Sequence, residues 1–160
     1  MASETPITLV QNPAFGAMLL WKFCSGFQKE RPDVLPVLTS LFCVLPVVFH
    51  GPTLSELKST NLPSGLVKFA TKLGEQRETL IALHDRALAM RELTFTSVAT
   101  GVATRLLRLN YATAQVSAND ERLPLLPERL KSHYAGAEKL GHWFARIPLS
   151  LAFSTLQIEP

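Results

Sequence analysis

Histidine, cysteine and carboxylate side chains could carry acid–base, nucleophilic or metal chemistry, but their spacing gathers none of them into a site. His84 and Asp85 are adjacent, and adjacent residues of a helix point in different directions, so they do not form a base with its orienting carboxylate. We therefore expect no catalytic residues, no metal site and no cofactor. No HExxH pattern and no CxxC pair occurs among His50, His84, His133, His142, Cys24 and Cys43.

Nucleotide chemistry has no sequence signature here either. The chain has neither the GxxxxGK[ST] loop that cradles phosphates nor the GxGxxG turn of dinucleotide-binding domains. We expect the isolated protein neither to hydrolyse nor to bind ATP tightly, and we expect no small-molecule substrate. An enzyme with an active site assembled from distant residues is the third of three hypotheses.

Aromatic side chains that alternate with small ones are the first candidates for binding. Two segments have this composition, NPAFGAMLLWKF from Asn12 and AEKLGHWFA from Ala137. Small residues let another helix approach closely, and Trp and Phe are frequent anchors of protein interfaces. Tight core packing is one interpretation, and a contact surface for a partner is the other. Under the second interpretation the partner-binding residues are Phe15, Trp21, Trp143 and Phe144.

Basic side chains give a second candidate surface, one for DNA. Arginine and lysine neutralise phosphates, and a recognition helix also needs polar groups for the base edges. One predicted helix offers Lys68 and Lys72, and another offers Arg105 and Arg108. The net charge of +3 permits contact with phosphates without requiring it. Solvated helix faces therefore rank first here, protein docking second and DNA binding last.

Helices are the main elements expected to position these residues. Asn12 is a good N-cap, and Pro13 lacks an amide hydrogen that would have no partner there, so a first helix should begin at this point. An apolar run predicts a central helix over 34–50, kinked at Pro46. The further predicted helices are a short one after a Thr53–Glu56 capping box, one over 65–73 ending at Gly74, a stretch over 75–109 broken near 93–97, and a last one over 127–147 with an apolar tail at 149–158.

A two-residue period replaces the helical period after Asn110. Small apolar residues alternate with polar ones over 111–118, and the Asn-Asp pair that follows is a turn signal. This pattern predicts one β-hairpin over 111–126. Helices followed by a hairpin form the element order of a winged helix, and we prefer 98–109 as its third helix. A helix-turn-helix over 51–73 is the alternative.

The fold class is therefore mainly α, with a winged-helix-like element. We expect a single helical domain over 12–160, preceded by an N-terminal arm over 1–11 in which Ile7 to Val10 could dock as an edge strand. A chain of 160 residues fits one such domain. The charged fraction of 18% is low and weakly favours burial against a partner.

The sequence also bears on cellular location. The N-terminus has no basic segment of the kind that begins a signal peptide, and the two cysteines fit buried thiols in a reducing cytosol. The longest apolar run, 34–49, is shorter than the ~20 residues that span a bilayer and contains two prolines. We therefore expect a cytoplasmic protein with no membrane partner.

Four segments carry a resemblance to a known family: NPAFGAMLLWKF, VLPVVFHGPT, SGLVKF, and AEKLGHWFA with the apolar tail. From Asn12 to Pro160 the chain resembles the middle-component family of bacterial three-component ABC systems. These operons encode a large coiled-coil ATPase of the SMC/Rad50 type, and some overlap with Lamassu-type anti-phage defence. The resemblance implies a small accessory subunit beside an ATPase and an effector, with no catalytic residues to carry over. The missing phosphate loop agrees, since the ATPase would be a separate chain.

Two binding hypotheses follow. The first is a non-catalytic accessory subunit of such a defence complex, which docks on the SMC/Rad50-like ATPase and helps couple it to an effector subunit from the same operon. DNA would be reached through that complex. The second is a winged-helix DNA-binding transcriptional regulator, which basic residues converging on one face would favour. A deep polar pocket with a perturbed acid would favour the enzyme hypothesis.

Overall fold

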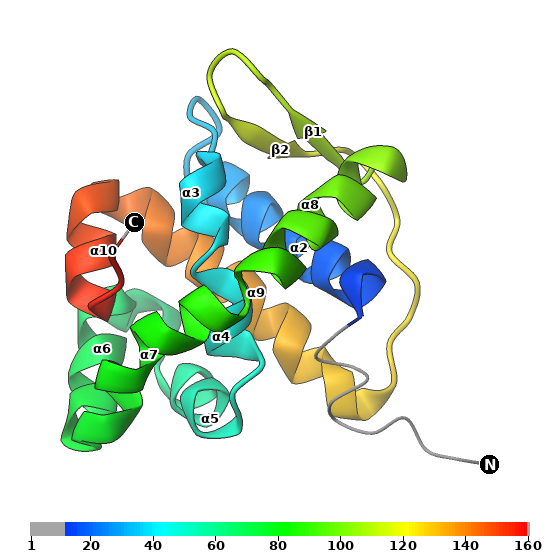
Figure 1. The fold of residues 1–160 in the computed structure, drawn as a ribbon. Helices are drawn as coiled ribbons and strands as arrows, with labels where there is room; N and C mark the ends of the chain where they lie inside the picture. Colours follow the sequence, from blue (N-terminus) through cyan, green and yellow to red (C-terminus); the bar gives the residue numbers. More distant parts are fainter. Residues whose placement is uncertain (1–11, 160) are drawn as a thin grey trace.

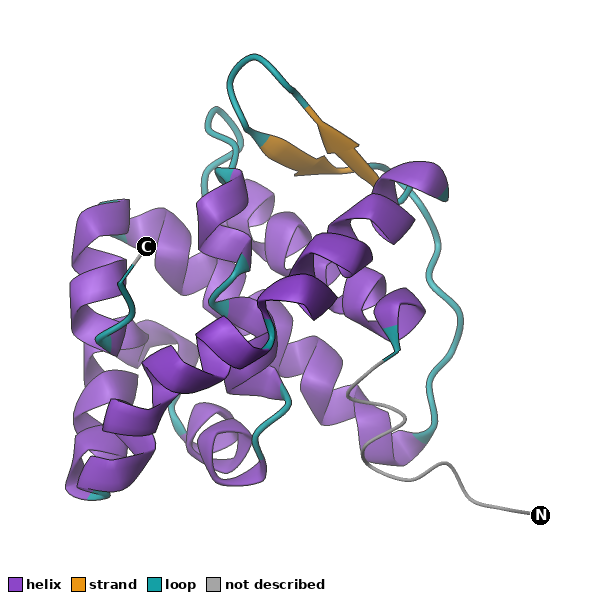
Figure 2. Cartoon of the chain, in the orientation of Figure 1, coloured by secondary structure: helices purple, strands orange, loops and turns teal. Residues whose placement is uncertain are grey.

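Helices form most of residues 12–159, the part of the chain that this computed structural model describes (Figures 1 and 2). The expected N-terminal arm, including Ile7 to Val10, lies outside the described residues. The elements in chain order are α2 (Pro13–Glu30), α3 (Leu38–Leu41), α4 (Val44–Val48), α5 (Gly51–Ser59), the 3-10 turn η1 (Leu62–Ser64), α6 (Gly65–Glu75), α7 (Arg77–Ala89), α8 (Arg91–Ala103), β1 (Leu107–Leu109), β2 (Val116–Ala118), the 3-10 turn η2 (Glu128–Leu130), α9 (Lys131–Arg146) and α10 (Leu149–Leu156). The expectation of a mainly α fold with one two-stranded antiparallel hairpin is confirmed.

Helix α2 begins where the sequence predicts. The Asn12 side-chain oxygen accepts hydrogen bonds from the backbone N–H groups of Ala14, at 2.9 Å, and Phe15, at 3.4 Å. Pro13 occupies the first helical position. A cap of this kind pairs backbone donors that the helix itself leaves without partners.

The centre of the molecule is the pair α2 and α9, which lie side by side with their backbones in close contact. A Cβ atom built on Gly141 would lie 2.0 Å from the Phe23 carbonyl oxygen, and one built on Gly26 would lie 2.2 Å from the Glu138 carbonyl oxygen. Only glycine fits at such distances, because any larger side chain would overlap backbone atoms. Phe23 and Phe144 meet edge to face beside this contact, with ring centroids 5.3 Å apart. Gly141 of the second aromatic segment and Gly26, just beyond the first, therefore serve tight core packing.

The central helix predicted over 34–50 is replaced by an extended turn and two short helices, α3 and α4. Val116 donates its backbone N–H to the Pro36 carbonyl oxygen at 2.9 Å, and Leu38 donates to the Ala114 carbonyl oxygen at 2.7 Å. These residues thus pair with the hairpin instead of with the next helical turn. Pro46 lies in the first turn of α4, where a backbone N–H would have no partner within that helix, so the proline is tolerated there.

The helical stretch predicted over 75–109 breaks at Met90 and not at 93–97, which lies inside α8. Thr94 and Ser97 are fully buried on the side of α8 that faces α2. A Cβ atom built on Gly16 would lie 2.1 Å from the Ser97 hydroxyl oxygen, which shows how closely α2 and α8 approach. Packing against α2 has overridden the weak helix propensity of these hydroxyl residues.

The hairpin exists, but the prediction placed it a few residues too late. Its strands are β1 and β2, which pair Leu107 with Ala118 and Leu109 with Val116. Arg105 has a φ of +65° and ends the helix before β1, so the predicted helix over 98–109 is too long. The second arm expected after Asp120 is not a strand in the described chain. The winged-helix likeness itself stays a prediction.

Turn residues explain this shift of the strands. The Asn110 side-chain oxygen accepts hydrogen bonds from the backbone N–H groups of Ala112, at 2.9 Å, and Thr113, at 3.3 Å. Asn110 therefore opens the turn between the strands and does not end a helix. The alternating segment after it is mostly turn, and Ala114 adopts a left-handed φ of +59° within it.

Three helix-end predictions also differ from the structure. Thr53 forms no capping box, because its hydroxyl is 2.7 Å from Nδ1 of His50 and accepts from Nη2 of Arg86 at 3.2 Å. Gly74 lies inside α6, which continues to Glu75. The last long helix starts at Lys131, and the expected apolar tail forms α10.

A ladder of ion pairs lies along one edge of the α2–α9 contact. Glu30 accepts from Nε of Arg146 and lies 3.3 Å from Nδ1 of His142. Glu138 accepts from Nζ of Lys29 at 2.8 Å. The hydrogen bond from Arg146 lowers the pKa of Glu30. Burial alone would raise the pKa of Glu138, but its bonds to the lysines outweigh burial and lower that pKa too.

We expect these carboxylates to make the fold sensitive to acid. Because their pKa values are lower in the folded state, their contribution is present at neutral pH and is lost as the pH falls from about the ordinary value of 4.5 downward. Glu138→Gln should lower stability at pH 7 by less than about 1 kcal/mol and flatten the acid side of the stability curve. Urea unfolding at several pH values measures this. Glu75→Gln, at an exposed carboxylate that forms no ion pair among residues 12–159, is the control substitution.

Among residues 12–159, no single helix is both long enough and apolar enough to cross a bilayer. The consecutive segments Leu38–Val48 and Gly51–Ser59 reach that length and composition only when taken together, and they are bent by 101°.

Candidate protein-docking groove

The aromatic residues proposed from the sequence as partner anchors divide between core and surface. Phe15, Trp143 and Phe144 are buried, with exposed fractions of 4%, 0% and 3%. Such side chains offer no contact area to a partner in this conformation. Trp21 is only partly buried, and its Nε1 donates to the Asn119 carbonyl oxygen at 2.8 Å, which ties α2 to the end of β2.

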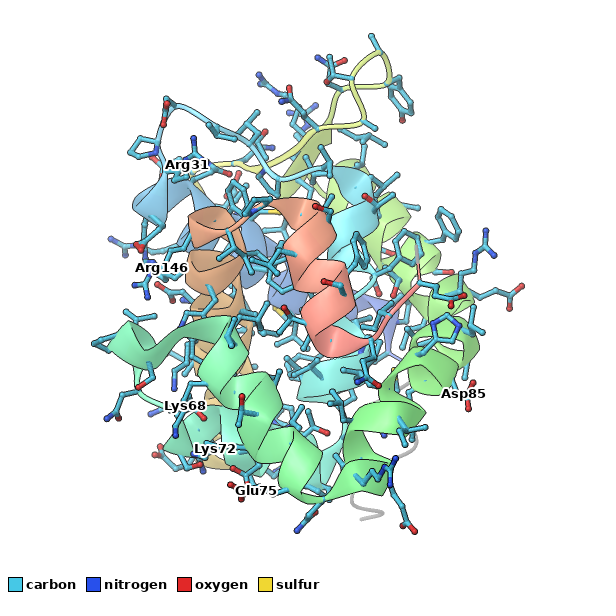
Figure 3. The ribbon with its side chains drawn as sticks, turned by 90° about the vertical axis from the view of Figure 1, so that its left-hand side faces the viewer. Arg31, Lys68, Lys72, Glu75, Asp85 and Arg146 are labelled. Atoms are coloured by element: carbon cyan, nitrogen blue, oxygen red, sulfur yellow. The ribbon has the colours of Figure 1, made fainter. Side chains whose placement is uncertain are left out.

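The basic residues proposed for DNA contact do not converge. Lys68 and Lys72 lie on α6 (Figure 3), whereas Arg105 follows α8 and Arg108 lies on β1, at the other end of the molecule (Figure 1). Lys72 is also engaged, since its Nζ donates to the Ser59 hydroxyl at 2.8 Å and lies 3.5 Å from a carboxylate oxygen of Glu56. Arg105 and Arg108 were expected on a recognition helix and instead lie in a turn and on a strand.

An open apolar groove of about 320 Å³ lies between α3, α7, α8 and the end of α10. Figure 1 shows these elements on one side of the molecule. Phe42 and Phe95 meet edge to face in it, with ring centroids 4.8 Å apart. The residues that line the groove are Leu38, Thr39, Phe42, His84, Ala87, Leu88, Arg91, Phe95, Phe153, Ile158 and Glu159.

The end of α10 builds one wall of this groove. Gln157 adopts a left-handed φ of +56°, and Ile158 donates its backbone N–H to the Phe153 carbonyl oxygen at 3.0 Å. This closing turn buries Ile158 against the core and aims the chain at α7, where the backbone N–H of Glu159 donates to Nδ1 of His84 at 3.1 Å. The apolar tail seen in the sequence is thus mostly covered by its own chain.

Helices α7 and α8 build the opposite wall and expose an apolar stripe. They run end to end with a break only at Met90 (Figure 1). Ile81, Leu88 and Phe95 follow one another at seven-residue spacing and are 56%, 54% and 48% exposed. Residues seven apart lie on the same side of a helix, so Ile81 and Leu88 share one side of α7. Phe95 follows on α8, beyond the break at Met90, and Leu88 and Phe95 both line the groove. A seven-residue apolar repeat suits contact with another helix.

The charge around the groove is small. Arg91 lies at its rim, with its guanidinium carbon 6.0 Å from the centroid of the Phe95 ring. Phe95 thus contacts both the Arg91 guanidinium and the Phe42 ring. This apolar lining with few polar groups suits protein contact better than acid–base chemistry.

The two cysteine thiols are buried and far from reactive. Burial raises the pKa of the Cys43 thiol to about 12 and raises that of Cys24 further. No three His, Cys, Asp or Glu side chains among residues 12–159 group closely enough to hold a metal ion. A shallow hollow of about 380 Å³ over α5 is lined by Ser55, Lys58 and other mostly polar residues, and it gathers no titratable cluster.

Neither the stripe nor the groove follows from the pattern of aromatic residues beside small ones. A usable signal was present in α7: apolar residues occur both on the buried side, at Leu83 and Ala87, and on the exposed side, at Ile81 and Leu88. A surface helix that is apolar on two sides leaves its outer side available for contact with a partner.

Comparison with known proteins gives one family match. The family model described as ABC-three component (ABC-3C) system Middle Component 3 matches residues 2–160. No curated protein and no solved structure matches the chain.

Proposed function

Because the chain belongs to the Middle Component 3 family of ABC-three component systems, we propose that it is a non-catalytic accessory subunit that docks on the ATPase of its system. In this role it helps couple the ATPase to an effector subunit. The partner would be a coiled-coil ATPase of the SMC/Rad50 type, and the setting would be an anti-phage defence complex in the cytoplasm.

The observation that carries this proposal is the apolar stripe of Ile81, Leu88 and Phe95 beside the groove. In a subunit of a multi-component system, an exposed apolar line has an evident use, which is burial against another subunit. The seven-residue spacing supports an amphipathic α-helix with its own apolar repeat as the occupant. A coiled-coil ATPase is built from such helices. The groove at Phe95 would then receive a large apolar side chain of that helix.

Substitution of Leu88 tests this docking mode. Leu88→Asp places a charge where the partner helix would bury an apolar side chain, and we expect affinity for the co-expressed ATPase to fall tenfold or more. The fold should tolerate the change because Leu88 is 54% exposed. Co-purification and titration of the purified subunits measure the loss, and circular dichroism checks the fold.

Val67→Asp is the matched control. Val67 is also 54% exposed, but it lies on α6, away from the stripe. It should bind the ATPase as the unchanged chain does. Equal binding by Leu88→Asp and Val67→Asp would refute docking through the stripe, and a monodisperse unchanged chain that ignores a folded ATPase would refute the proposed function itself.

DNA binding has less support. Two of the four candidate cations lie on α6 and two lie at the hairpin end of the molecule, and one of them, Lys72, is engaged by Glu56 and Ser59. A DNA-binding surface needs several phosphate contacts on one face, which these two separated pairs do not provide. We therefore do not propose that the chain is a winged-helix DNA-binding regulator.

A further inference from the structure

The connection between β2 and α9 contains the sequence Leu123-Pro124-Leu125-Leu126-Pro127, and its backbone is restricted almost throughout. Pro124 and Pro127 have their φ angles fixed by the ring. Leu123 and Leu126 each precede a proline, which disfavours the helical region and favours extended backbone. Pro127 has φ −53° and ψ 148°, close to polyproline II geometry. Four of these five residues are thus restricted in backbone conformation by the two proline rings.

The exposure of this segment follows the three-residue period of a polyproline II helix. Leu123 and Leu126 are half-buried, and Leu126 packs against the core. Pro124 and Pro127 are both exposed, and Leu125 is 98% exposed, more than any other large hydrophobic side chain of the described chain. The segment therefore rests on one side and presents two prolines and a leucine on the others.

The backbone of this segment is also open. None of the hydrogen bonds formed among residues 12–159 involves residues 120–126, and the segment follows the outer edge of the molecule as a loop (Figures 1 and 2). A connection needs only length, and loops that merely connect are usually rich in polar turn residues. An exposed leucine between two prolines is instead a feature that a protein partner can bind.

We propose that the segment 123–127 is a preformed polyproline II ligand that docks in an aromatic-lined groove on a partner subunit of the same system. The pattern Pro-x-x-Pro is the kind that such grooves recognise, because the prolines pack on aromatic rings and the extended backbone leaves its carbonyl oxygens accessible. Its restricted backbone loses little conformational entropy on binding. Leu125 would fill an apolar pocket between the two proline sites. This inference rests on the proposed function and adds a second contact to it.

The test uses the full chain co-expressed with the other subunits of its system. Leu125→Ala should weaken the complex about tenfold. Leu125→Met, which keeps a long apolar side chain, should bind as the unchanged chain does. The double variant Pro124→Ala, Pro127→Ala keeps Leu125 but frees the backbone, and it should also weaken binding. Leu125 is so exposed that its variants should keep the thermal stability of the unchanged chain.

A photo-reactive amino acid placed at position 125 gives a second readout. It should cross-link to a partner segment rich in Trp, Tyr or Phe, whereas the same group at position 67 should not. Unchanged binding by both the Leu125→Ala and the double proline variant would overturn the inference. If Leu88→Asp still abolished docking in that case, the proposed function would stand without this second contact. Cross-links to a partner surface without aromatic residues would also overturn it.

Discussion

Gly141→Ala should destabilise the chain by about 3 kcal/mol or prevent it from folding. The new Cβ would lie 2.0 Å from the Phe23 carbonyl oxygen and 2.9 Å from the Phe27 backbone nitrogen. These are backbone atoms of α2, so no side-chain rotation can relieve the overlap and the two helices must move apart. Separation would loosen the packing along the whole α2–α9 contact. Overpacking costs typically 1–3 kcal/mol and more where neighbours cannot yield.

At Gly74 the same glycine-to-alanine substitution should raise stability, not lower it. Gly74 also lies inside a helix, but it is exposed, and a Cβ there would meet only Cδ2 of Leu80 at 3.7 Å. Gly74→Ala should stabilise the chain by about 0.5–1 kcal/mol, because alanine has the higher helix propensity. Urea unfolding followed by circular dichroism compares the two variants. Similar midpoints for both would mean that the α2–α9 backbone contact is looser than described here.

Local signals in the sequence predicted the ends of several elements well. Asn12 and Pro13 begin α2 as expected, because a cap is decided by groups within one turn of chain. The hairpin was found but misplaced, since a two-residue period does not distinguish a strand from an extended turn. Its position depends on hydrogen bonds from Val116 to Pro36 and from Leu38 to Ala114. Residues so far apart in the chain cannot be paired from spacing alone.

The candidate site was harder to predict than the fold. Trp143 and Phe144 resembled interface anchors in the sequence, since core and interface use the same residue types. What separates them is burial by α2 and α6, which is a property of the assembled fold. Leu88, by contrast, looked like one more apolar residue of an amphipathic helix. Its exposure follows from how α7 packs on the rest of the fold, with Leu83 and Ala87 buried and Leu88 on the outer side.

The two tryptophans provide the sharpest comparison of a core role with a surface role. Trp143 is fully buried, stacks against Phe69 with ring centroids 5.6 Å apart, and donates from Nε1 to the Leu62 carbonyl oxygen at 2.9 Å. Trp143→Ala should cost about 3–5 kcal/mol, because it removes a whole buried ring and leaves a cavity. Trp143→Phe should cost less, since Arg146 also donates to the Leu62 oxygen, at 2.8 Å, and keeps that oxygen paired.

Trp21→Ala should behave differently in two measurements made on the same samples. Trp21 is only partly buried and holds the end of β2 through its bond to Asn119, so its loss should cost about 1–2 kcal/mol and leave the helices folded. In a pull-down with the ATPase, a folded Trp21→Ala chain that no longer binds would mark Trp21 as an interface anchor, and retained binding would restrict it to fastening the hairpin. Trp143→Ala should fail in both measurements. If circular dichroism instead showed Trp143→Ala to be as stable as Trp21→Ala, the packing of α9 against α2 and α6 could not be the core of this protein, because a core cannot lose its largest side chain without consequence.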